Sequence, residues 1–304
     1  MINSLISGIK KKDKVSLSKS ITVVENRIKG YKDILRQTFN LNNNSLKIGI
    51  TGPPGAGKST IVNEVAKIYT KNNKSVGIIC VDPSSPFNGG SILGDRIRLN
   101  DLYSKNVFIR SISTRGELGG LFSSVSDIDT LYSAFDFDVI IYETVGVGQA
   151  EMDIMNYSNT VLLVITPESG DDIQMMKSGL LECADIITIN KSDRPGALRL
   201  NATLDKLKFS KNGWDVPTVR TVGLNGEGFE TLINQISKHS GFLSDNNIFE
   251  KINYQKYLKQ VRDIASEKIL TGFFNPKRMS AIDREISKPL KDRLSPQDLF
   301  EKIK

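Results

Sequence analysis

The chain has 304 residues, of which 39% are hydrophobic, and a formal net charge of +7 at pH 7. This length predicts a globular protein with one large α/β domain and extensions, or two modest domains. No apolar run approaches the roughly 18 residues that cross a bilayer, and residues 1–20 lack the apolar core of a secretory signal, so we expect a cytoplasmic protein without a membrane partner. Cys80 and Cys183 lie far apart in apolar segments, which predicts buried free thiols.

The positive charge is concentrated at the two ends of the chain. Residues 1–45 hold 9 Lys and Arg against 3 Asp and Glu, residues 251–304 hold 13 against 7, and the middle holds 19 against 24. A nucleic-acid-binding protein usually concentrates its basic residues in a stripe with aromatic residues for base stacking, whereas here the lysines alternate with apolar residues at helical spacing. We therefore interpret them as solvated helix faces and expect no nucleic-acid partner, while an acidic protein partner stays open.

Residues 1–45 predict an N-terminal helical extension. Apolar residues recur there at intervals of three and four, which favours one or two amphipathic helices that end near residue 38 and pack on the next domain. The domain at 46–245 alternates short β-branched runs with longer helical stretches. Strands are predicted at 46–50, 76–81, 107–112, 139–142, 161–165, 186–189 and 218–222. Such runs indicate strands covered on both faces, and hence a doubly wound, mainly parallel sheet with its ligand at the strand carboxyl ends.

The segment G-P-P-G-A-G-K-S-T follows the first strand and fits the phosphate-binding pattern G-x-x-x-x-G-K-[ST] between a strand and a helix. Its glycines let consecutive backbone N–H groups approach phosphate oxygens, Lys58 reaches the β- and γ-phosphates, and Ser59 offers a hydroxyl to Mg²⁺. A simple glycine turn is the alternative, which the full pattern in this context disfavours. We expect the whole segment to bind nucleotide: Gly52, Pro53, Pro54, Gly55, Ala56, Gly57, Lys58, Ser59 and Thr60.

Three carboxylates predict the remaining metal environment. Asp82 closes the strand at 76–81, Asp95 lies in a glycine-rich stretch, and both could reach Mg²⁺ directly or through its waters. Alone, Asp82 before proline would more often be an ordinary turn. Glu143 closes the strand at 139–142 and is expected to hold a metal-bound water, while the Gly146 N–H meets the terminal phosphate. A flexible strand exit is the alternative for that segment.

The residue that orients the attacking water is not decided by the sequence. Gln149 and Glu143 are the candidates, and Arg96 or Arg115 could supply a positive charge.

The motif N-K-S-D after the strand at 186–189 predicts guanine recognition through Asn190, Lys191 and Asp193. The Asp193 carboxylate can accept from guanine N1–H and the exocyclic amine, whereas adenine has no donor at N1 and no amine at C2. We therefore expect GTP and GDP, with Mg²⁺, rather than ATP. The loop at Val222, Gly223 and Leu224 stands where GTPases place a second guanine-contacting loop, and we expect backbone contacts there.

Residues 246–304 predict a C-terminal helical extension, with a break at 272–276 and a last helix opened by Ser295 and Pro296. The apolar stripe of its first helix packs either on its own domain or on a second subunit, and we favour a homodimer. His239 is the only histidine and is interpreted as incidental.

With these motifs assembled, the chain resembles the MeaB/ArgK family of GTPases over nearly its whole length. The resemblance extends to L-S-K-S-I-T-V-V-E-N at 17–26, V-D-P-S-S and G-G-S-I-L-G-D at 81–95, G-E-L-G-G at 116–120, and E-T-V-G-V-G-Q at 143–149. It implies a dimeric P-loop GTPase of the class shared with signal-recognition and nickel-insertion GTPases.

The resemblance also implies a client, adenosylcobalamin-dependent methylmalonyl-CoA mutase. The GTPase is then expected to gate cofactor delivery to this mutase and to protect or reactivate it. By matching position, Ser59, Asp82, Asp95 and Glu143 resemble the Mg²⁺ environment. Residues 167–174 resemble the loop that relays nucleotide state to the mutase, although Glu168 and Ser169 replace the more usual Gly-Ala.

Three alternatives remain at this point. The chain could serve another client, such as a related acyl-CoA mutase or a metal centre, although a nickel role lacks histidine and cysteine ligands. It could target proteins to a membrane, although it lacks a methionine-rich signal-binding domain. It could also be a transport-associated ATPase or kinase, against which the N-K-S-D motif argues.

Overall fold

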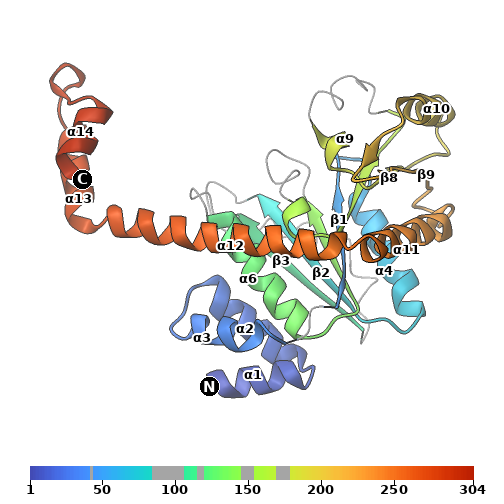
Figure 1. The fold of residues 1–304 in the computed structure, drawn as a ribbon, viewed down its shortest axis with the longest axis horizontal. Coiled ribbons are helices and arrows are strands. Elements are labelled where there is room, and N and C mark those ends of the chain that lie inside the picture. Colours follow the sequence, from blue (N-terminus) through green and yellow to red (C-terminus); the bar gives the residue numbers. More distant parts are fainter. Residues whose placement is uncertain (42–43, 84–105, 115–119, 145–153, 169–178) are drawn as a thin grey trace.

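The computed structural model describes residues 1–41, 44–83, 106–114, 120–144, 154–168 and 179–304. Its centre is a seven-stranded sheet in the order β3-β2-β4-β1-β5-β6-β9, in which all neighbours pair in parallel (Figure 1). The predicted doubly wound parallel sheet is confirmed, and each predicted strand is present. The strands are β1 (Leu46–Thr51), β2 (Val76–Pro83), β3 (Val107–Thr114), β4 (Val139–Thr144), β5 (Thr160–Ile165), β6 (Ile186–Ile189) and β9 (Thr218–Arg220).

Helices cover both faces of this sheet, which explains why its strands read as continuous apolar runs. In β5, Leu162 and Val164 share a core with α4 (Lys58–Lys71) and α11 (Phe229–Asp245). Leu163 and Ile165 face the other way and pack against α9 (Leu180–Cys183) and α10 (Ala197–Leu207). On that second face, α6 (Gly120–Ala134) covers the neighbourhood of β2 and β4.

The N-terminal extension folds as three helices, not one or two: α1 (Ile2–Lys10), α2 (Lys14–Glu25) and α3 (Tyr31–Thr38). The Asp13 carboxylate starts α2 by accepting from the Val15 and Ser16 N–H groups, and Gly30 precedes α3 with a φ of +96°. The Asp13 cap begins α2 and the left-handed Gly30 comes just before α3. The spacing of the apolar residues alone does not show these two helix boundaries. Leu17 and Ile21 of α2 join the core around α6, so the predicted packing of this extension on the sheet domain is confirmed.

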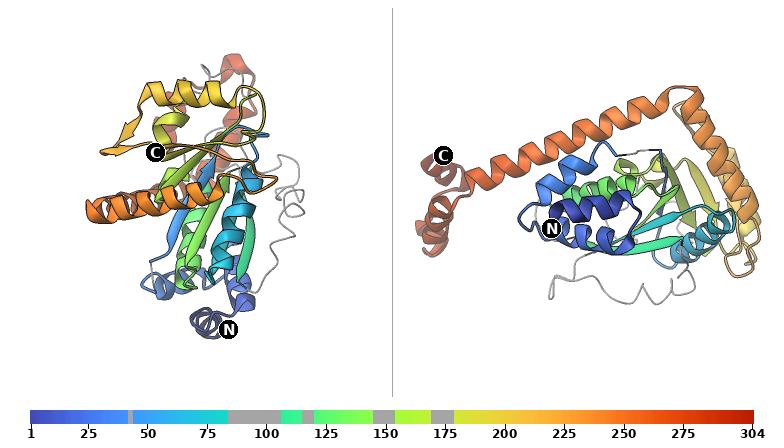
Figure 2. Two further views of the ribbon diagram at one scale, coloured as in Figure 1. Left: turned by 90° about the vertical axis from the view of Figure 1, so that its right-hand side faces the viewer. Right: turned by 90° about the horizontal axis from the view of Figure 1, so that it is seen from below.

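The C-terminal extension continues from α11 as α12 (Ile248–Phe273), which crosses the molecule beside α6 and carries α13 (Pro276–Ile286) and α14 (Pro296–Ile303) away from the body (Figures 1 and 2). Asn275 and Ser295 cap α13 and α14, and each is followed by proline at the first helical position. The predicted break and last helix are therefore confirmed. Within the described ranges, no helix has the length and apolar content that a membrane span needs.

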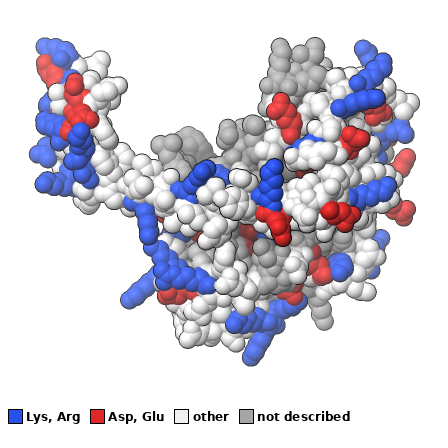
Figure 3. Space-filling view, viewed as in Figure 1, with Lys and Arg blue, Asp and Glu red and all other residues white. Residues whose placement is uncertain are grey.

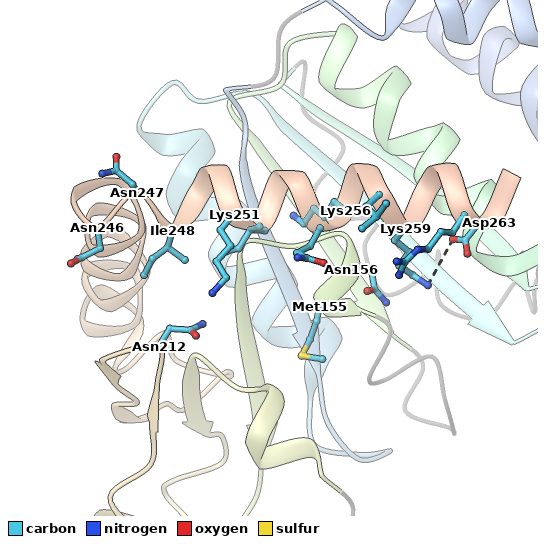
Figure 4. Close-up of a pocket in the computed structure, with 14 residues that line it drawn as sticks. Met155, Asn156, Asn212, Asn246, Asn247, Ile248, Lys251, Lys256, Lys259 and Asp263 are labelled. Carbon is cyan, nitrogen blue, oxygen red and sulfur yellow. Dashed lines mark ion pairs between the residues drawn. The ribbon is translucent and has the colours of Figure 1, made fainter. Parts of the chain in front are cut away.

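A groove of about 810 Å³ separates α12 from the short 3₁₀-helix at Ile154–Asn156 and from the turn between β7 (Ser210–Lys211) and β8 (Trp214–Asp215). Figure 4 shows Lys251 extending from α12 toward Asn212 in that turn. Lys256 donates to the Tyr157 carbonyl and to Asn159 Oδ1, just before β5 begins. Burial first, and then the charge of Lys47, lower the pKa of Lys256 to about 7. The groove thus lies at the amino end of β5, away from the phosphate-binding loop.

His239 is not incidental, because it is buried in a polar cluster at the base of the sheet. Its Nδ1 shares a 2.9 Å hydrogen bond with Thr160 Oγ1, its Nε2 lies 3.7 Å from Asp185 Oδ1, and its ring lies edge-on to Trp214. The Lys211 ammonium also lies 2.8 Å from Asp185 Oδ1. The imidazole therefore joins α11 to the β7–β8 hairpin and to the starts of β5 and β6.

This cluster predicts a pH dependence of stability. Burial, opposed by Asp185 and assisted by Lys211, lowers the pKa of His239 below its usual value of 6.5. The unfolded chain therefore takes up the His239 proton first as the pH falls, so the free energy of unfolding decreases below about pH 6.5. Urea unfolding between pH 7 and 5.5 should show a steeper loss of stability in the wild type than in a His239→Gln variant, and equal slopes would contradict this role.

Candidate functional site

The phosphate-binding loop lies between β1 and α4, and two of its glycines sit against other parts of the site. Gly52 has a φ of +142°, and a Cβ there would lie 2.0 Å from the Val164 carbonyl oxygen on β5. Gly57 has a φ of +88°, and its Cβ would lie 2.3 Å from Asn190 Nδ2. A side chain at either position would be strained by the positive φ and would force a close neighbour to move, which is the Val164 backbone for Gly52 and the Asn190 side chain for Gly57.

Lys58 is buried at the start of α4, and its ammonium lies over its own loop. The Nζ atom donates to the carbonyl of Gly52 at 2.7 Å and to that of Pro53 at 3.1 Å. The amine is therefore held against the loop carbonyls at the N-terminus of α4, where a helix favours negative charge. Gly55 sits open in this loop, with no atom within 4 Å of where its Cβ would be.

The structure brings Ser59 and Glu143 together, as a metal-binding role for both requires. Ser59 Oγ donates to Glu143 Oε1 at 2.6 Å, and the Cys80 thiol lies 3.8 Å from Glu143 Oε2. The Glu143 carboxylate is buried at the end of β4, beside β2, where Val81 pairs with Thr144. A hydroxyl and a carboxylate fit Mg²⁺, which takes oxygen ligands, keeps few from the protein and fills the rest with water.

Not every predicted metal or phosphate residue can be placed. Asp82 lies on β2 next to this pair, but its side chain is outside the described residues, as are Asp95, Gly146 and Gln149. Arg96 and Arg115 fall outside them too. Within the described part of the chain, no group of three or more His, Cys, Asp or Glu side chains is arranged to hold a metal ion.

Asn190 connects three loops around the predicted nucleotide site. It is buried after β6, its Nδ2 donates to the Ala56 carbonyl at 2.9 Å, and its Oδ1 accepts from the Gly223 N–H at 3.2 Å. The next residue, Lys191, has a φ of +55° and donates from Nζ to the Gly55 carbonyl at 2.9 Å. The base-recognition motif is thus fixed directly to the phosphate-binding loop, while guanine contact by Asn190 itself stays a prediction.

The two remaining predicted base contacts differ in their surroundings. The Asp193 side chain is exposed to solvent. In the second loop, Val222 is buried and Leu224 is 96% exposed. A Cβ on Gly223 would lie 2.6 Å from Thr60 Cγ2, so this loop packs closely on the start of α4.

Sequence reasoning missed three residues that shape this site. Thr221 is fully buried, accepts the Ser192 N–H at its carbonyl, and lies 3.4 Å from Asn190 through its hydroxyl. Cys80 was expected only to be a buried thiol, which it is, but it also faces the Glu143 carboxylate. Arg194, which follows the motif, pairs with Glu168. Of the three, only Thr221 directly follows a parallel strand, where residues of such sites are expected.

Comparison with known families decides the identity. The model of the family described as methylmalonyl Co-A mutase-associated GTPase MeaB matches residues 17–277. The chain belongs to the MeaB family of GTPases. The match extends from α2 to the start of α13 and so includes the phosphate-binding loop, Glu143 and the N-K-S-D motif.

Similar proteins agree with this membership. A candidate GTPase of Pyrococcus horikoshii is 43% identical over 86% of this chain and 85% of its own length. The GTPase ArgK of Escherichia coli is 30% identical over 88% of this chain and 85% of its own. A crystal structure described as a LAO/AO transport system kinase superposes with a TM-score of 0.74 over 99% of this chain and 96% of that one, at 22% identity, and shows the P-loop fold. This MeaB family member is therefore a nucleotide-binding P-loop GTPase.

Proposed function

We propose that this GTPase binds GTP with Mg²⁺, hydrolyses it, and uses the cycle to gate adenosylcobalamin delivery to methylmalonyl-CoA mutase and to protect or reactivate that enzyme. The observation that carries the proposal is the physical connection of the base-recognition motif to the phosphate-binding loop, through Asn190 to Ala56 and Lys191 to Gly55. It occurs in a chain that the mutase-associated family matches from residue 17 to residue 277.

Each residue of the site has a chemical role in this proposal. The loop N–H groups and Lys58 bind the phosphates, and Lys58 stabilises the charge that develops as water attacks the γ-phosphate. Ser59 and Glu143, with Asp82 and Asp95, hold Mg²⁺, which neutralises phosphate charge when bound. Gly146 contacts the γ-phosphate, and Glu143 or Gln149 orients the water. Asp193 accepts hydrogen bonds from guanine, with Asn190, Lys191 and the 222–224 loop beside it.

We also propose that two copies associate through α12. None of its residues is fully buried, and its exposed apolar stripe includes Tyr254, Tyr257, Val261, Ile264 and Ile269, of which Ile269 is 69% exposed. In Figure 3 the part of α12 between the charged tip and the body is mostly uncharged surface. A helix face of this kind favours burial against another chain.

The dimer proposal predicts the effect of a charge placed in this stripe. Because a buried, unpaired carboxylate is costly, Ile264→Glu should shift the protein from dimer to monomer in light scattering. Ser266→Glu adds the same charge to α12 outside the stripe and should leave the dimer intact. A wild-type protein that is monomeric at micromolar concentration would contradict the proposal.

The client proposal is tested by nucleotide-dependent binding to purified methylmalonyl-CoA mutase. The protein should co-elute with the mutase in gel filtration, and the retained fraction should differ between GDP and a non-hydrolysable GTP analogue. Co-elution with a related acyl-CoA mutase instead would keep the GTPase and change the client. No binding to either mutase would contradict the client proposal.

A further inference from the structure

Glu168 and Arg194 join two loops at the carboxyl edge of the sheet. Glu168 follows β5, Arg194 follows Asp193 directly, and Arg194 Nη1 donates to Glu168 Oε1 in a hydrogen-bonded ion pair. The same loops are also linked by the Asn190 N–H, which donates to the Ile165 carbonyl at 2.8 Å. The carboxyl ends of β5 and β6 therefore set the distance between the Glu168 carboxylate and the Arg194 guanidinium.

The Glu168–Arg194 ion pair lies next to Asp193, the predicted guanine contact, and so can influence the charge around it. Its side chains are 46% and 49% exposed, and ion pairs this exposed contribute little to stability. The Glu168 hydrogen bond and charge raise the pKa of Arg194, and Asp193 adds to the rise. The guanidinium thus lies within electrostatic reach of the Asp193 carboxylate. Glu168 provides a second carboxylate to which this guanidinium donates.

We propose that Glu168 is a positioning residue for guanine recognition, because it binds Arg194 and so leaves the Asp193 carboxylate available to the base. The inference rests on the proposed function of Asp193. Guanine presents N1–H and an amine, and a guanidinium presents the same kind of paired donors, so the two compete for the same carboxylate oxygens. Once Glu168 is neutral, Arg194 turns to Asp193 and the base loses its acceptor.

Four variants measured for GDP affinity test this competition. Glu168→Gln should weaken the Kd about three- to tenfold at low ionic strength, as expected for one solvent-exposed charge interaction. Arg194→Gln alone should leave the Kd close to that of the wild type, because no competing cation remains. Glu168→Gln combined with Arg194→Gln should return the Kd to within about twofold of the wild type. High salt should reduce the Glu168→Gln defect.

The double variant separates competition from damage to the loop. If Glu168→Gln weakens GDP binding only by damaging the loop, the weaker Kd will persist or worsen when Arg194 is also replaced, and that result would overturn the proposal. An unchanged Kd in Glu168→Gln would also overturn it. Asp193→Asn serves as the fourth variant. Loss of GDP affinity there with no effect of Glu168→Gln would reject the positioning role alone, whereas GDP binding unaffected by Asp193→Asn would reject the base-recognition proposal itself.

Discussion

Replacing Lys58 with alanine is expected to lower kcat for GTP hydrolysis by about 10²- to 10³-fold, the usual effect of removing one group that stabilises transition-state charge. The reason is geometric, because the ammonium is buried and held over the phosphate-binding loop by the Gly52 and Pro53 carbonyls. The Lys58 ammonium therefore does not have to move when negative charge develops on the γ-phosphate. Phosphate release at saturating GTP measures the effect.

A matched control comes from the same helix. Lys71 lies exposed at the end of α4, and Lys71→Ala removes the same charge without touching the loop. It should hydrolyse GTP at the wild-type rate. Circular dichroism of the Lys58→Ala protein shows whether it has folded, and a folded Lys58→Ala protein with wild-type kcat would contradict the assignment of the loop.

Asp193→Asn is expected to change the nucleotide that the protein prefers from guanine to xanthine. The carboxylate accepts from two guanine donors, whereas an asparagine amide places an N–H₂ group opposite the guanine amine. Because a donor then faces a donor, GTP affinity should fall about 10²-fold or more. Xanthine carries a carbonyl at C2, so XTP should bind the variant more tightly than it binds the wild type.

Asp215→Asn is the control for this change, because Asp215 is exposed on β8 in the separate hairpin. It should retain the wild-type order of GTP over XTP. Competition titrations against a fluorescent guanine nucleotide measure all three proteins. Equal GTP affinity in the wild type and Asp193→Asn would show that the carboxylate does not recognise the base.

The elements that the sequence predicted well are those encoded by neighbouring residues. The strands could be predicted because burial on both faces requires continuous apolar runs. The phosphate-binding loop could be predicted because its glycines and Lys58 lie within one short segment. The division of the N-terminal extension was missed because one capping carboxylate, Asp13, and one left-handed glycine, Gly30, interrupt an otherwise helical pattern.

What escaped prediction depends on contacts between distant parts of the chain. Asn190 and Ala56 are 134 positions apart and meet only because β1 and β6 end at the same edge of the sheet. His239 was interpreted as incidental because Thr160 and Asp185, which surround it, are far away in the sequence. Local patterns carry no information about such pairs, so the motif identified Asn190 but not its three-loop connection.

The most direct test of the account is steady-state GTP hydrolysis by the purified protein, alone and with methylmalonyl-CoA mutase, with ATP as the control nucleotide. We expect slow GTP turnover that rises several-fold when the mutase is added, and no comparable turnover of ATP, because adenine offers Asp193 no donors at N1 and C2. GTP turnover that the mutase leaves unchanged, or ATP turnover equal to that of GTP, would contradict it.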